Sequence, residues 1–137
     1  MVAGLLRLFA VNSEGRSGGL VLFWTDSSKI SLKGYCKNFI DVSITQEDGL
    51  TWRATFVYGE PKLELRHVFW DRIRFLHAQW EGPWICAGDF NGVLNGHEHK
   101  GRCDTSSTQM NLFRECLEDC EPIDLGYIGP KFTWNNR

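Results

Sequence analysis

Apolar and polar residues alternate in short blocks over the first part of the chain, as in consecutive β-strands. Apolar residues dominate segments 5–11 and 20–24, and the glycine-rich segment 12–19 between them predicts a hairpin connection. After a polar turn at 26–28, a weaker strand is predicted around 30–32. The chain is therefore expected to open with strands.

Two further strands follow from strict alternation. Apolar residues take every second position over 40–45 and again over 51–58, the period of a half-buried strand. Between them, residues 46–49 carry a hairpin turn signal. The first 58 residues therefore predict an antiparallel meander.

A helix is predicted next, opened by Pro61 at a position where its missing N–H does no harm. Its apolar residues are spaced three or four apart and form one stripe, at Leu65, Phe69, Ile73, Leu76 and Trp80. Four basic residues lie mostly off this stripe and are interpreted as a solvated face in preference to a phosphate track: Arg66, Arg72, Arg74 and His77.

A second helix is predicted from a capping box, with Ser106 as N-cap and Gln109 at the third helical position. Pro122 limits it, and residues 132–134 read as a final strand. One face of this helix carries Met110, Phe113, Leu117 and Cys120. Cys116 and Cys120 are interpreted as small core residues.

Residues 83–91 between the two helices join an apolar half to a polar half. The apolar run predicts a strand covered on both faces, and Gly88 removes a side chain where another group must approach closely. Asp89 and Asn91 leave the same face if the backbone is still extended. A carboxylate beside an amide suits a divalent metal, or a water steered toward a phosphate. The alternative is a turn that satisfies only its own backbone.

Composition indicates one globular domain over residues 1–137, with 42% hydrophobic and 13% aromatic residues. The net charge of -2 provides no general basic field, so a nucleic-acid partner would be held locally or through a metal. Five cysteines without a C-x-x-C pair favour a reducing, intracellular compartment, and no signal peptide or membrane span is predicted. His97, His99 and Cys103 match no common zinc spacing.

Six short motifs also follow one another in a fixed order. They are Gly15-Arg16-Ser17-Gly18-Gly19-Leu20, Tyr58-Gly59 with Pro61, Pro83-Trp84 leading into Gly88-Asp89-Phe90-Asn91, Glu98 with Lys100-Gly101, Asp124-Leu125-Gly126, and Phe132-Thr133-Trp134-Asn135-Asn136-Arg137. In this order they resemble the endonuclease/exonuclease/phosphatase superfamily (DNase I-like). The resemblance is greatest to the endonuclease domain of plant LINE-type non-LTR retrotransposons.

The resemblance implies an α/β (α+β) fold, a four-layer sandwich of two mostly antiparallel sheets with helices outside. It implies Mg²⁺-dependent phosphodiester hydrolysis, DNA as partner and a nuclear location for a functional protein. By position in the motifs, Asp89 would activate the attacking water and bind the metal, and Asn91 would bind the phosphate or orient Asp89. Tyr58 would contact the phosphate, and Thr133 and Trp134 would line the floor of the substrate site.

The sequence departs from this family at both flanks. A metal-binding glutamate is expected upstream of the Gly-Gly turn, where Glu14 is the only acidic residue, and the family's closing Asp-His pair has no counterpart. We therefore expect a truncated, inactive domain with exposed sheet edges that favour self-association. Two other hypotheses are a non-catalytic module that binds nucleic acid or protein, and a small phosphoester hydrolase.

Overall fold

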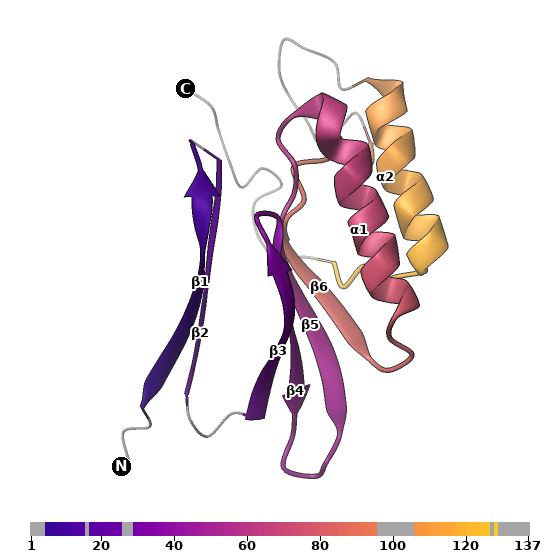
Figure 1. The fold of residues 1–137 in the computed structure, drawn as a ribbon. Helices are drawn as coiled ribbons and strands as arrows, with labels where there is room; N and C mark the ends of the chain where they lie inside the picture. Colours follow the sequence, from indigo (N-terminus) through magenta and orange to yellow (C-terminus); the bar gives the residue numbers. More distant parts are fainter. Residues whose placement is uncertain (1–4, 16, 26–28, 96–105, 127, 129–137) are drawn as a thin grey trace.

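The described residues form a mixed α+β fold of six strands and two α-helices (Figure 1). The computed structural model describes residues 5–15, 17–25, 29–95, 106–126 and 128. In chain order the elements are β1 (Leu6–Glu14), β2 (Ser17–Thr25), β3 (Lys29–Cys36), β4 (Phe39–Thr45), β5 (Thr51–Tyr58), the 3-10 turn η1 (Leu63–Leu65), α1 (Arg66–Ala78), β6 (Trp84–Asp89) and α2 (Ser107–Cys120).

The strands form two separate sheets. β1 and β2 form an antiparallel hairpin, as predicted, but both strands reach further into the glycine-rich segment than expected. Among the described strands, the larger sheet has the order β3-β4-β5-β6, with the β5–β6 pair parallel and the other two pairs antiparallel. The prediction of one continuous meander is therefore wrong, because β2 and β3 belong to different sheets. The predicted turn at 26–28 lies outside the described residues.

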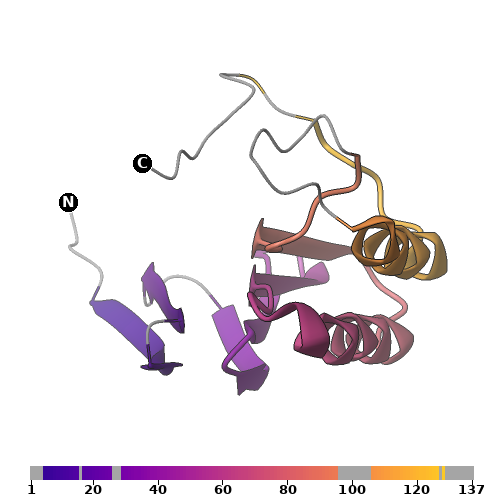
Figure 2. The same ribbon diagram turned by 90° about the horizontal axis from the view of Figure 1, so that it is seen from above.

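Three layers result from the packing of these elements (Figure 2). The small sheet faces one side of the larger sheet, where Ile40, Val42 and Ala54 form a core with Phe9, Val11, Leu20 and Leu22. Both α-helices cover the opposite side of the larger sheet (Figure 2). The core on that side includes Phe69, Trp70, Ile73, Leu76 and Phe113.

The larger sheet is buried differently from what the alternating pattern predicts. In β4 even the polar residues Asp41 and Ser43 are buried, because the helices cover the face that alternation assigns to solvent. β6, expected to be covered on both faces, is instead the edge strand among the described strands, with Ile85 46% exposed. The half-buried prediction for β4 and the fully covered prediction for β6 are both wrong. The helices cover the second face of β4, and β6 stands at the end of the strand order.

The first helix begins later than predicted. Pro61 precedes η1, and α1 starts only at Arg66. Leu65 is 38% exposed and Trp80 lies beyond the helix end, whereas Trp70, absent from the predicted stripe, is 1% exposed. A stripe read from spacing alone was therefore correct only in its middle, at Phe69, Ile73 and Leu76.

The second helix agrees with its predicted cap. Ser106 Oγ accepts a hydrogen bond from the Gln109 backbone N–H at 3.4 Å. Cys116 and Cys120 are buried in the core, as expected, and burial raises the pKa of Cys116 to about 12. No helix among the described residues is long and apolar enough to cross a membrane.

Candidate functional site

Several chain segments that are distant in sequence meet at one end of the two sheets. β5 and β6 run parallel and finish together, with Tyr58 opposite Asp89 in the register. The turn between β3 and β4 joins them there, because Tyr58 N donates to Asn38 O at 2.8 Å. The structure therefore brings together three of the five predicted site residues, Tyr58, Asp89 and Asn91. We call Tyr58, Glu60, Arg66, Asp89 and Asn91 the sheet-end cluster.

Two glycines allow the β5 and β6 ends to approach closely. A Cβ atom on Gly88 would lie 2.0 Å from the Val57 carbonyl oxygen, and one on Gly59 would lie 1.9 Å from that of Phe90. Across this junction Gly59 N donates to Asp89 O at 2.6 Å. The prediction that Gly88 makes room for a close neighbour is confirmed, and that neighbour is the backbone of β5.

One carboxylate oxygen of Asp89 stabilises a turn, and the other is not bonded by any described residue. Its Oδ1 accepts from Asn91 N at 2.8 Å, which is the turn proposed as the alternative to a binding role. Its Oδ2 accepts from none of the described residues, and the side chain is exposed. The turn therefore fixes the carboxylate while leaving one oxygen open to solvent.

Asn91 is fixed as well, although not by extended backbone. Its φ of 49° is left-handed, so the condition for placing Asp89 and Asn91 on one face is not met. Instead Asn91 Nδ2 donates to Gly59 O at 2.8 Å, back across the junction. This bond leaves the amide oxygen as the remaining acceptor of the side chain.

Glu60 is a buried carboxylate that the sequence analysis did not single out. It is 4% exposed, its Oε2 lies 3.0 Å from Lys37 Nζ, and its Oε1 accepts from Lys62 N at 3.2 Å. Burial alone would raise the pKa of Glu60, but the hydrogen bonds from Lys37 and Lys62 outweigh it and leave the pKa lowered. The available signal was an acidic residue between Gly59 and Pro61, directly after a strand.

Arg66 brings a positive charge to the same place. Its Nε donates to Glu60 O at 3.0 Å, so the guanidinium is held near the end of β5. Burial lowers the pKa of Arg66, and the negative charges of Asp89 and Glu60 oppose that effect. The helix arginines are therefore not the solvated face that was predicted: Arg66, Arg72 and Arg74 are all half-buried and hydrogen-bonded.

The sheet-end cluster offers few metal ligands among its described side chains. A depression of only about 10 Å³ lies beside it, lined by residues that include Lys37, Asn38, Tyr58 and Glu60. Within the described residues, no group of three His, Cys, Asp or Glu side chains could hold a metal ion. One carboxylate oxygen and one amide oxygen fit a Mg²⁺ ion shared with a phosphate, because this ion keeps several waters and uses substrate oxygens as ligands.

Part of the predicted site lies outside the described residues. This applies to the substrate-site residues Thr133 and Trp134, to the strand at 132–134, and to His97, His99 and Cys103.

Comparison with known proteins assigns no family to the chain. No family model matches its sequence, and no curated protein matches it. What the site can do is therefore set by its own groups: an open carboxylate oxygen, a fixed amide and a half-buried guanidinium.

Proposed function

We propose that this chain is part of a Mg²⁺-dependent endonuclease domain of retrotransposon type, and that its sheet-end cluster binds a DNA phosphodiester. The observation that carries the proposal is the parallel pairing of Tyr58 with Asp89. Tyr58 and Asp89 belong to separate sequence motifs, and this pairing puts them together at one end of the sheet, with Arg66 beside them. Convergence of phosphate-binding chemistry at the carboxyl ends of parallel strands is a common use of α/β sheets.

Each group in the cluster has a distinct part in this function. Asp89 presents Oδ2 to a metal ion or to the attacking water, while its Oδ1 remains in the turn. Arg66 supplies positive charge to the phosphate, and Asn91 offers its amide oxygen to the metal ion. A bound Mg²⁺ would polarise the phosphate and acidify a water.

The packing supports the finer fold proposal, a four-layer sandwich. Two sheets already face each other, and helices cover the outside of the larger one (Figure 2). The outside of the small sheet is apolar, with Leu6, Leu8, Val21 and Phe23 each 53–63% exposed. A second helical layer over this face would complete the four-layer arrangement.

Titration of Mg²⁺ against the wild type and Asp89→Asn, with and without a short DNA duplex, tests the proposal. We expect the duplex to raise the Mg²⁺ affinity of the wild type, and Asp89→Asn to lower that affinity about tenfold. Asp48→Asn is a matched control, since Asp48 Oδ1 accepts from Leu50 N at 2.9 Å in an equivalent exposed turn. Identical isotherms for wild type and Asp89→Asn would reduce Asp89 to a turn residue and refute the function.

A further inference from the structure

A second hollow, much larger than the first, lies between β3 and α1. It is a groove of about 620 Å³, within the range of about 300–1,000 Å³ that ligand sites occupy. β3 forms one wall as the edge strand of the larger sheet. The other wall comes from one side of α1 and the residues after it, with Arg72, Phe75 and Trp80 among them. We call this the β3–α1 groove.

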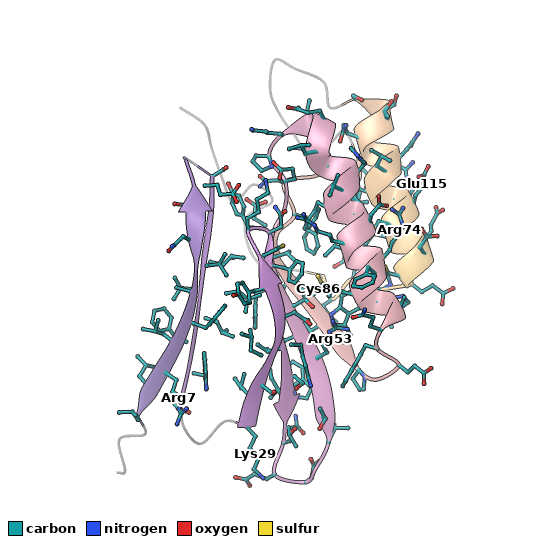
Figure 3. All side chains as sticks on the ribbon, in the orientation of Figure 1. Arg7, Lys29, Arg53, Arg74, Cys86 and Glu115 are labelled. Atoms are coloured by element: carbon teal, nitrogen blue, oxygen red, sulfur yellow. The ribbon has the colours of Figure 1, made fainter. Side chains whose placement is uncertain are left out.

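The floor of the groove is polar but electrically neutral. Arg53 lies on the larger sheet, on the side that faces α1 (Figure 3). It binds the carboxylate of Asp41 through Nε and Nη2 at 2.7–3.0 Å, and its Nη1 donates to Leu76 O at 2.7 Å. Gly34 pairs with Asp41 in the sheet and has no side chain to cover it. The charged groups of the floor are thus already paired with each other. The charge available to a ligand lies mainly on the walls of the groove.

The walls carry uncompensated positive charge. Arg72 donates from Nη1 to Asn38 Oδ1 at 2.9 Å and to Cys36 Sγ, while its other N–H groups meet no acceptor among the described residues. Lys33 is exposed and has no ion pair within the described part of the chain. With Asp41 neutralised by Arg53, the groove is a cationic region in a chain whose net charge is -2.

Aromatic surface lies beside these charges. Phe75 is 62% exposed and sits three residues after Arg72, so both belong to one side of α1. Trp80 lines the same wall. An exposed aromatic ring next to cations suits a base with its phosphate, because rings stack on bases and cations neutralise the backbone.

The β3 edge itself argues against a peptide as the occupant. Its register with β4 shifts between Leu32 and Gly34, and Lys33 stands at this irregularity. Bulges and lysines on edge strands hinder the addition of another strand.

The groove also adjoins the sheet-end cluster, since Arg72 binds Asn38, whose Nδ2 donates to Tyr58 O at 3.0 Å.

We propose that the β3–α1 groove binds single-stranded nucleic acid, with bases against Phe75 and Trp80 and phosphates on Lys33 and Arg72. This site extends the proposed function. The choice of nucleic acid over other anionic polymers rests on that function. A strand bound here would continue toward the sheet-end cluster across Asn38.

Binding of a labelled oligothymidylate of about eight nucleotides, measured by fluorescence anisotropy in Mg²⁺-free, low-salt buffer, tests the groove. We expect Phe75→Ala to weaken binding about tenfold. Lys33→Gln should weaken it several-fold and flatten the slope of log affinity against log salt by about 0.7. Both residues are exposed, so the variants should fold.

Matched controls separate this proposal from the function on which it rests. Phe23→Ala removes another exposed ring, from β2, and Lys29→Gln another exposed lysine of β3, and neither residue lines the groove. Both controls should bind as the wild type does. Absence of binding, equal affinity of Phe75→Ala and wild type, or an equal loss in Phe23→Ala would each overturn the groove site. Failure of the Mg²⁺ titration alone would refute the endonuclease proposal and leave this result standing.

Discussion

Asp41 shows how much a single buried residue can organise. It is 1% exposed and accepts from the Arg53 guanidinium and from Thr55 Oγ1 at 2.7 Å. Thr55 in turn accepts from Trp84 Nε1 at 2.8 Å, so one carboxylate connects β4, β5 and β6. Because Arg53 also binds Leu76 O, the network reaches α1 as well.

We expect Asp41→Ala to lower the free energy of unfolding by about 3–5 kcal/mol, because it leaves the Arg53 charge buried without its partner. Urea unfolding followed by circular dichroism measures this. Asp48→Ala, at an exposed turn, should change stability by well under half that amount. The double variant Asp41→Leu with Arg53→Met should be less destabilised than Asp41→Ala, since it removes both charges. A loss below about 1 kcal/mol in Asp41→Ala would contradict this role.

Residue types pointed to candidate residues that lie together at the sheet end, but not to their partners. Asp89, Asn91 and Gly88 stand out because a polar pair follows an apolar run. Glu60 and Arg66 were missed, since their roles depend on contacts with Lys37 and with the end of β5 that spacing does not encode.

Elements were predictable where the signal is local. Turn residues and alternation located β4 and β5 within a residue, and the capping box located α2. The start of α1 was missed because a 3-10 turn intervenes after Pro61. Strand order was not predictable at all, since the position of β6 at the edge depends on a parallel pairing across a helix.

The β5–β6 junction is the element contact on which the site depends most. Gly88 has a φ of 140° and no room for a Cβ, whereas Gly49 has a φ of 87° and open space around it. Alanine at Gly49 should therefore cost about 1–2 kcal/mol from backbone strain alone. Alanine at Gly88 adds a backbone clash, and we expect a total loss of more than about 3 kcal/mol.

Urea unfolding of Gly88→Ala and Gly49→Ala checks this difference. The Mg²⁺ titration with duplex adds a second measurement at the site, where Gly88→Ala should lose affinity and Gly49→Ala should not. Equal stability of the two variants would show that β5 and β6 separate without cost, contrary to their close packing.

For the whole molecule, we expect no nicking of supercoiled plasmid above buffer with Mg²⁺ or Mn²⁺. The sheet-end cluster offers one open carboxylate oxygen, and groups that complete a metal site are typically worth several kcal/mol of transition-state stabilisation each. Gel analysis of plasmid topology measures the outcome. Turnover that Asp89→Ala abolishes, with the fold intact, would show that the chain is an active enzyme.

The outer face of the β1–β2 hairpin is apolar and exposed. Leu8 and Phe23 face each other in the register and are 61% and 57% exposed, with Leu6 and Val21 beside them. No described residue covers this apolar face, and both hairpin edges are free of strands in the described part of the chain. Packing this face against a second copy of the chain buries apolar surface, which stabilises the contact by about 25 cal/mol for each Å² buried.

We therefore expect the purified chain to self-associate with rising concentration, through this face. Sedimentation velocity over a hundredfold concentration range measures the association. Leu8→Lys with Phe23→Lys should give a monomer, because two charges on adjacent strands oppose burial of the face. Leu50→Lys, at a 49% exposed position of the β4–β5 turn, is the matched control and should associate like the wild type. A wild type that stays monomeric throughout, with no dye binding to exposed apolar surface, would contradict self-association through the hairpin face.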